Sequence, residues 1–200
     1  MRIFLIWPAK GSGSEVGELM NEIEKHGHKI AYWVGRPEAA EYAPAGAIFH
    51  SYIDAADAKP AKNINPNAFP PPSKNLIRDF RDTESIALTM MNNLYFYDRL
   101  CTDERRRIYY LMLRYWLGTL KKYQPDAVIF PNTPHLVYSY ILYKAARYLG
   151  IKTVVFYDSR IPGRLIRLDD FKQGCVPLQK ELKAMSGQKV SLADLPDDIG

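Results

Sequence analysis

The stretch MRIFLIWPAKGSGSEVGELMNEIEKHGHKIAYWVGR, residues 1–36, carries the pattern that points to a fold class. It begins with a continuous apolar run at 2–7, which is typical of a strand buried on both faces. A glycine- and serine-rich turn at 10–14 leads into a helix whose apolar side chains recur every three or four residues. Gly27 ends this helix in the left-handed conformation that is common at helix C-termini, and a second strand follows at 29–34.

The same pattern continues further along the chain. Strands are expected at 47–52, 126–131 and 152–157, and a helix is expected at 134–149, where Gly150 closes it. Strands that alternate with helices favour a parallel sheet covered on both faces. The sequence therefore predicts an α/β fold, a Rossmann-like open parallel sheet of about five strands with helices on both faces.

The middle of the chain breaks this rhythm. The section 54–75 is so rich in proline that we expect little regular structure in it. A loop of this length in a compact domain is a binding loop, a lid or a disordered insert. Two helices are expected after it, at about 76–100 and 103–123. The second is apolar or aromatic around most of its circumference, which indicates a helix buried on several sides or one that forms an interface.

The predicted organisation is one domain followed by a short tail. The Rossmann-like domain spans 1–171 and includes the proline-rich insert. The C-terminal segment, 172–200, contains one further helix at 177–186 and a linker-like end, which we interpret as a connection toward a second domain.

The composition is that of an ordinary globular protein. Hydrophobic residues make up 47% and charged residues 24% of the chain, and no apolar run resembles a membrane span or a signal peptide. The net charge of +5 suits an anionic small ligand or an anionic membrane surface, but no nucleic-acid-binding motif accompanies it. Two cysteines without metal-site spacing favour a cytoplasmic protein with no intrinsic metal.

Polar residues gather directly after the predicted strands. In an open parallel sheet, ligands bind outside the carboxyl ends of the strands, near the point where the strand order reverses. The candidates are Ser12 and Gly13 after the first strand, His50 and Asp54 at the end of the third, Asn132, Thr133 and His135 after the fourth, and Arg160 and Arg164 after the fifth. The two arginines either bind a phosphate or carboxylate group or pair with neighbouring aspartates.

The turn after the first strand has two interpretations. Its N–H groups and the following helix N-terminus suit a phosphate or carboxylate, or else it is a flexible turn in which Ser14 caps the helix. The spacing of Gly11, Gly13 and Gly17 is one residue longer than the dinucleotide-binding motif requires. Arg36 also stands where that motif has an acidic ribose ligand. A nucleotide-dependent oxidoreductase or epimerase is therefore a weaker hypothesis.

The two histidines among the candidates also leave alternatives open. Thr133 suits an N-cap and Pro134 a first helical position, which would place His135 in the first turn of a helix. The helix dipole disfavours a positive imidazolium there, so a neutral His135 either donates to a ligand oxygen or only packs. His50 is either a buried, hydrogen-bonded histidine or a general base.

Several segments together resemble a known group of proteins. They are Lys25-His26-Gly27-His28-Lys29, Phe49-His50-Ser51-Tyr52, Pro125-Asp126-Ala127-Val128-Ile129-Phe130-Pro131-Asn132-Thr133-Pro134-His135, Leu149-Gly150-Ile151-Lys152-Thr153, Ile161-Pro162-Gly163-Arg164 and Asp169-Asp170-Phe171. The first is similar to a corner in the N-terminal half of GT-B-type glycosyltransferases. The others resemble bacterial capsular or surface-polysaccharide biosynthesis proteins, and the resemblance covers roughly residues 1–175.

The resemblance implies the acceptor-side domain of a metal-independent glycosyltransferase-like protein in capsular or surface polysaccharide biosynthesis. In the GT-B plan a second Rossmann-like domain holds the nucleotide-sugar donor, so a saccharide acceptor or a nucleotide sugar is the expected partner. His135 and His50 are then the candidate catalytic bases. The candidate sugar ligands are Asn132, Thr133 and Asp54, and the candidate anion contacts are Ser12, Gly13, Arg160 and Arg164.

A second hypothesis is a non-catalytic module that binds a sugar, a lipid-linked precursor or a partner protein. The aromatic helix at 105–123 and the proline-rich loop at 59–72 favour it. Such a helix would form a homodimer or contact the inner face of the membrane.

Overall fold

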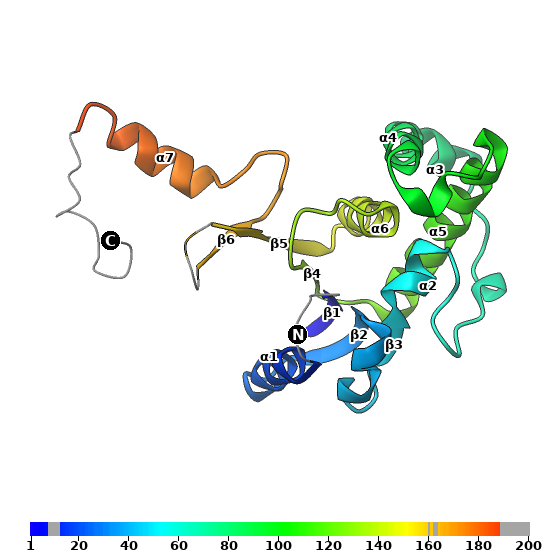
Figure 1. The fold of residues 1–200 in the computed structure, drawn as a ribbon, viewed down its shortest axis with the longest axis horizontal. Helices are drawn as coiled ribbons and strands as arrows, with labels where there is room; N and C mark the ends of the chain where they lie inside the picture. Colours follow the sequence, from blue (N-terminus) through cyan, green and yellow to red (C-terminus); the bar gives the residue numbers. More distant parts are fainter. Residues whose placement is uncertain (8–12, 160, 162–163, 189–200) are drawn as a thin grey trace.

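The computed structural model describes residues 1–7, 13–159, 161 and 164–188, and its core is one six-stranded sheet with the order β3-β2-β1-β4-β5-β6. The strands are β1 (Arg2–Ile6), β2 (Lys29–Gly35), β3 (Ile48–Ser51), β4 (Ala127–Phe130), β5 (Lys152–Asp158) and β6 (Leu165–Leu168). The first five run parallel, which confirms the predicted Rossmann-like α/β fold (Figure 1).

Helices surround this sheet. They are α1 (Gly13–Lys25), α2 (Tyr52–Ala56), α3 (Lys74–Asp79), α4 (Arg81–Asn92), α5 (Thr102–Tyr123), α6 (Val137–Tyr148) and α7 (Val176–Ala184), with short 3-10 helices η1 (Pro37–Tyr42), η2 (Pro66–Ala68) and η3 (Tyr95–Tyr97). Successive strand residues point to opposite faces. On one face Leu5 and Trp33 pack against α1, and on the other Phe4 and Tyr32 pack against α5 and α6.

The strand β6 was not predicted from the sequence. It pairs antiparallel with β5, from Leu168 opposite Val155 to Leu165 opposite Asp158. The expected parallel sheet of about five strands is thus corrected to six strands, the last of which is an antiparallel edge strand. β6 has only four residues, and the third is charged, so the run is too short for a pattern of apolar residues to identify it as a strand.

The section between β3 and α5 is more helical than predicted. α2 begins directly after β3, and the Ser51 hydroxyl caps it by accepting from the Ile53 N–H at 3.2 Å. The single helix expected over 76–100 is wrong, because the chain forms α3, α4 and η3 instead. α3 and α4 meet at Phe80, whose ring is buried in the core.

The proline-rich loop packs against α5. The Arg114 guanidinium donates to the carbonyl oxygens of Phe69 at 2.7 Å and Asn67 at 3.1 Å. The Phe69 ring lies directly over Gly118, where a Cβ atom would meet the ring at 2.1 Å. This loop is therefore a packed part of the fold.

α6 begins three residues later than predicted. Its N-cap is Leu136, and the Ser139 hydroxyl accepts from the Leu136 N–H at 3.3 Å and donates to the Leu136 carbonyl at 2.8 Å. The expected cap at Thr133 is wrong, and His135 lies in the turn before the helix. The helix-dipole argument for a neutral His135 therefore does not hold.

α5 buries the aromatic side chains that suggested an interface. Tyr109, Tyr115 and Trp116 are all buried in the core on the α5 face of the sheet, and Leu111 is the large apolar side chain of this helix that stays exposed. The aromatic side chains of α5 are thus explained by burial within the chain, and a dimer or membrane contact through this helix stays a prediction. Among the described helices, none combines the length and the apolar character needed to cross a membrane.

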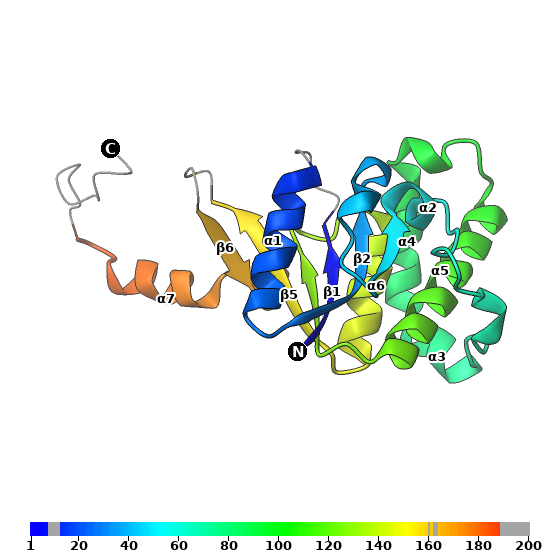
Figure 2. The same cartoon turned by 90° about the horizontal axis from the view of Figure 1, so that it is seen from below.

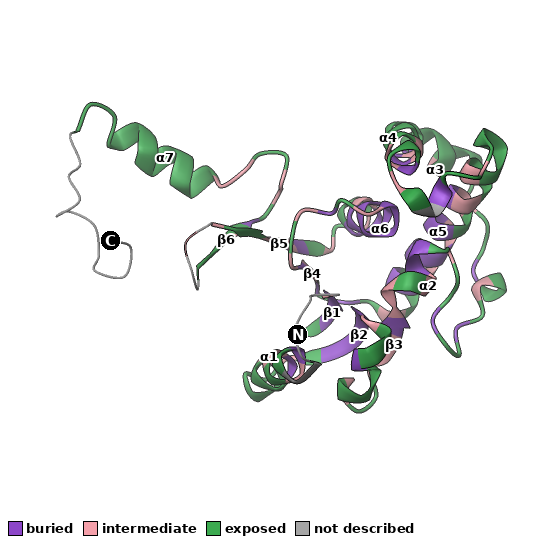
Figure 3. Cartoon of the chain, viewed as in Figure 1, coloured by how far each residue is buried: buried purple, intermediate pink, exposed green. Residues whose placement is uncertain are grey.

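α7 stands apart from the other helices. It extends beyond β6 in Figure 1, is exposed along its whole length in Figure 3, and contains no buried residue. It corresponds to the helix predicted at 177–186, whereas the linker-like end from 189 onward lies outside the described residues. The division into a domain at 1–171 and a segment at 172–200 stays a prediction.

Gly118 tests the packing of the proline-rich loop on α5. In an exposed helix interior, alanine is more favourable than glycine by about 1 kcal/mol. Here the added Cβ would overlap the Phe69 ring, so we expect Gly118→Ala to lower the free energy of unfolding by about 1–3 kcal/mol. Urea denaturation followed by far-ultraviolet circular dichroism measures this change.

The control combines Gly118→Ala with Phe69→Ala, because the second substitution removes the atoms that overlap. The glycine substitution should then cost less than it does in the presence of the ring. A Gly118→Ala protein at least as stable as the unsubstituted protein contradicts the described packing.

Candidate functional site

The candidate site lies at the carboxyl edge of the sheet, where the parallel strands end. Along the sheet, the chain runs from β1 to β2 and β3 on one side, and from β4 to β5 on the other, so the order reverses between β1 and β4. Ligands of open parallel sheets bind at this reversal. Figure 2 shows α1 beginning at the same edge. We call the end of β1 with Trp7, the start of α1 and the turn 131–136 the switch point.

The turn between β4 and α6 supplies the polar side chains of the switch point. Asn132 and His135 are exposed, and Thr133 is half-buried. His135 Nδ1 lies 3.0 Å from the Thr133 carbonyl oxygen, and since a carbonyl only accepts, Nδ1 must carry the proton and donate it. In the neutral ring, Nε2 is then unprotonated. No residue that the structure describes forms a hydrogen bond with this Nε2.

Two aromatic side chains lie near the carboxyl ends of the strands on either side of β4, and the sequence analysis missed both. Trp7 directly follows β1 and Phe156 belongs to β5, the strands on either side of β4. Their half-buried rings meet edge to face, with centroids 6.3 Å apart. The signal in the sequence was an aromatic residue at the end of each apolar run. Aromatic rings beside a few polar groups are a common composition for a small-molecule site.

Of the remaining candidates at this edge, the structure describes Gly13 and Arg164. Gly13 is the first residue of α1 and lies at the switch point. Arg164 stands just before β6, where its carbonyl accepts from the Ser159 hydroxyl at 2.7 Å. Ser12 and Arg160 lie outside the described residues, so their role as anion contacts stays a prediction.

His50 lies in the core rather than at the edge. Its side chain is 1% exposed. Nε2 donates to the Lys59 carbonyl at 3.0 Å, which leaves Nδ1 to accept from the Tyr32 hydroxyl at 2.6 Å. The Tyr32 oxygen accepts from the Tyr115 hydroxyl at 2.7 Å, and the Tyr115 oxygen accepts from the Ala61 N–H at 3.0 Å. The donor and the acceptor of every hydrogen bond in this chain are thus assigned.

These contacts favour a structural role for His50. Both ring nitrogens are hydrogen-bonded within the protein, and burial lowers the pKa of His50 to about 4, with smaller opposing effects from the hydrogen bond to Lys59 and the charge of Asp54. β3, which carries His50, also lies three strand spacings from β4, or about 14 Å. The sheet order thus separates His50 and Asp54 from the switch point, and the base role predicted for His50 stays untested.

The turn at the switch point offers an imidazole nitrogen, an amide and a hydroxyl, and Trp7 and Phe156 lie at the same edge of the sheet. Such groups can accept a proton from a hydroxyl and hydrogen-bond to a polyhydroxylated ligand. Within the described ranges, no three His, Cys, Asp or Glu side chains are grouped closely enough to hold a metal ion.

None of the protein-family models that were scanned matches this chain, and none of the curated proteins that were searched matches it. Among solved structures, the chain is similar to the glycosyltransferase VinC in complex with DTDP, with a TM-score of 0.35 and 12% sequence identity. The match covers 98% of this chain and 41% of that one, so the chain spans less than half the length of VinC. A similarity at this level carries no argument about fold or function.

The buried His50 should make stability depend on pH. Its pKa is about 4 in the folded protein against 6.5 when unperturbed, so the unfolded chain binds more protons between these values. The stability that depends on neutral His50 is complete above pH 6.5 and is lost as the pH falls toward 4. Between pH 7 and pH 5 we expect a loss of about 2 kcal/mol, measured by urea denaturation.

His50→Gln provides the comparison, because the amide still offers a donor to the Lys59 carbonyl but does not titrate. The difference between the pH dependences of the two free energies of unfolding gives the contribution of His50, because the carboxylates contribute equally to both proteins. Two parallel stability curves over this pH range would show that His50 does not titrate as described.

Proposed function

We propose that this chain is the acceptor-side, N-terminal-type domain of a GT-B-type glycosyltransferase-like protein that acts in capsular or surface polysaccharide biosynthesis. One observation carries the proposal, namely the His135 ring at the switch point. Its Nδ1 donates to the Thr133 carbonyl at 3.0 Å, which leaves Nε2 as a proton acceptor on an exposed side chain.

This arrangement suits the proton transfer that glycosyl transfer requires. The acceptor hydroxyl attacks the anomeric carbon of a nucleotide sugar and gives its proton to a base, while the bond to the phosphate leaving group breaks. In the proposal, Nε2 of His135 takes that proton, and Asn132 and Thr133 hydrogen-bond to neighbouring hydroxyl groups. Positive groups or N–H donors stabilise the leaving phosphate.

The phosphate groups of the nucleotide sugar would bind to other residues of the same edge. α1 begins at Gly13 at the switch point, and a helix N-terminus offers N–H groups without intrahelical partners and the positive end of a helix dipole. Arg164, with Ser12 and Arg160 from outside the described residues, is proposed as a further anion contact on the same edge. The aromatic pair Trp7 and Phe156 would pack against the apolar face of a sugar ring.

The non-catalytic alternative receives less support. The aromatic residues of the helix at 105–123 pack into the core, and the loop at 59–72 packs on that helix. The two features that suggested a partner-binding surface thus make their contacts within the chain.

The base role of His135 can be tested by substitution. In the full-length protein, we expect His135→Ala to lower kcat for transfer of a labelled sugar from a nucleotide sugar to a saccharide acceptor by about 10²–10⁴-fold, the usual contribution of a general base. Asn132→Ala should mainly raise KM for the acceptor. Because both side chains are exposed, the thermal unfolding midpoint should stay nearly unchanged.

His26→Ala is the matched control. His26 is also exposed and also donates from Nδ1 to a carbonyl, that of Glu22 at 2.8 Å, but it lies in the corner between α1 and β2 at the opposite edge. Equal rates for the His135→Ala and His26→Ala proteins would remove the base role. Acceptor saccharides that shift NMR signals away from 131–136 would remove the switch point as the sugar site.

A further inference from the structure

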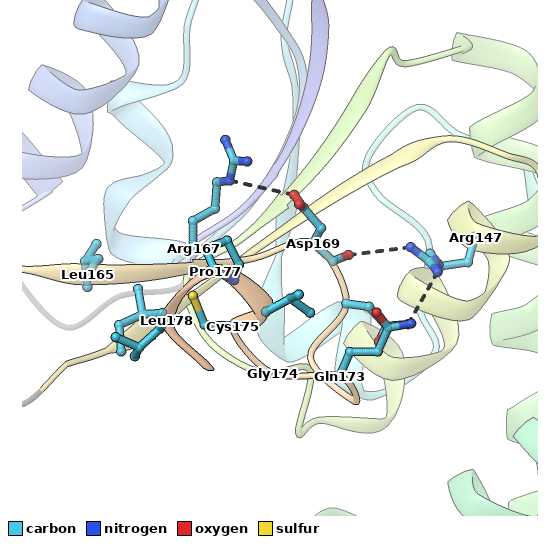
Figure 4. A pocket seen from close by; sticks show the side chains of 12 residues that line it. Arg147, Leu165, Arg167, Asp169, Gln173, Gly174, Cys175, Pro177 and Leu178 are labelled. Atoms are coloured by element: carbon cyan, nitrogen blue, oxygen red, sulfur yellow. Dashed lines mark hydrogen bonds and ion pairs between the residues drawn. The ribbon is translucent and has the colours of Figure 1, made fainter. Parts of the chain in front are cut away.

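A second pocket lies along β6, the edge strand of the sheet, and extends to the amino edge between the end of α6 and the start of α7. Its volume is ≈ 530 Å³, within the range of small-molecule sites. Figure 4 shows Arg147 on one side and Arg167 on the other, with Asp169 between them. We call this cavity, lined by Arg147, Leu165, Arg167, Asp169, Val176 and their neighbours, the amino-edge pocket.

Cationic side chains from three elements border the amino-edge pocket and its extension. Arg147 comes from α6 and Arg167 from β6. An adjoining hollow of ≈ 450 Å³ shares both arginines and is also lined by Lys152, the first residue of β5. In the described part of the chain, the Lys152 ammonium has no hydrogen bond or ion pair.

The acidic groups of the pocket neutralise only part of this charge. Asp170 is 19% exposed and is held within the fold, because it pairs with Arg147 at 3.4 Å and accepts from the Tyr143 hydroxyl at 3.1 Å and the Lys172 N–H at 2.9 Å. Asp169 reaches Arg167 only at 3.7 Å, and both side chains are more than 60% exposed. Exposed pairs of this kind are weak, so Arg167 can turn toward a ligand.

Part of the pocket is apolar. Leu165 and Val176 line it and are 56% and 40% exposed. A ligand that matches both the cationic and the apolar side chains therefore has an anionic group and an apolar part. A phosphate offers three oxygens, so it can accept from cations on separate elements more readily than a carboxylate with two.

We propose that the amino-edge pocket binds an organic phosphate, with the phosphate near Arg167 and Lys152 and the apolar part against Leu165 and Val176. The proposed phosphate contacts, Arg167 and Lys152, are not residues of the switch point, so the proposal does not depend on the proposed function. Arg147 contributes charge but also holds Asp170, so it is not the residue to substitute.

The test uses phenyl phosphate as the probe. Inorganic phosphate and phenol, which represent its anionic and apolar parts, are the control ligands. Titrations of the whole chain are followed by amide NMR signals at low ionic strength. We expect phenyl phosphate to shift signals at 147–153 and 165–178 and to bind about three- to tenfold more tightly than inorganic phosphate, because it also buries an apolar ring. Added salt should weaken the binding.

Arg167→Gln and Lys152→Gln should each raise the Kd for phenyl phosphate by about five- to tenfold. Arg78→Gln is the matched control, because Arg78 is also exposed and also has a long ion pair, 3.9 Å from Asp79, on α3. All three side chains are exposed, and equal thermal midpoints confirm intact folding.

Three results would overturn the proposal. They are a chain that does not bind phenyl phosphate, an equal loss of affinity in all three variants, and signal shifts confined to the switch point. The first two leave the proposed transfer activity untouched, so the two proposals can fail independently.

Discussion

One buried chain of hydrogen bonds joins the sheet to α5 and to the proline-rich loop. It runs from the Ala61 N–H through Tyr115, Tyr32 and His50 to the Lys59 carbonyl. β2, β3, α5 and the proline-rich loop each contribute at least one group. In an apolar core an unpaired hydroxyl or imidazole is costly, so each member depends on all the others being in place. Burial also raises the pKa of both tyrosines, which keeps their protons on the hydroxyl groups.

This network explains why α5 is so rich in aromatic residues. Trp116 packs against His50 with ring centroids 5.7 Å apart and against Tyr115 at 5.0 Å, and Phe4 stacks on Tyr32 at 4.8 Å. The rings keep water away from the hydrogen bonds and let the tyrosines present both an apolar body and a polar end. The aromatic side chains of this helix are therefore required inside the fold.

Local pattern predicted much of the architecture, and partners distant in the chain account for most of what it missed. The apolar runs located β1 to β5, and Gly27 and Gly150 adopt the expected left-handed conformation, with φ of +76° and +71°. The start of α6 was missed because Ser139, inside the helix, supplies the cap that Thr133 was expected to supply. β6 was missed because a four-residue strand is defined by its pairing with β5 rather than by its own sequence.

The two candidate histidines show which part of a site the sequence can place. Each lies near the end of a predicted strand, so the sequence pattern made the two histidines equally good candidates for the site. However, His50 lies inside β3, opposite Val34, and a residue within a strand must point to one face of the sheet. His135 lies five positions after the last residue of β4, beyond the ladder, where the chain is free to turn its side chain to the edge. The bounds of the strand, rather than the residue type, therefore decide whether a histidine joins the core or remains open to a ligand.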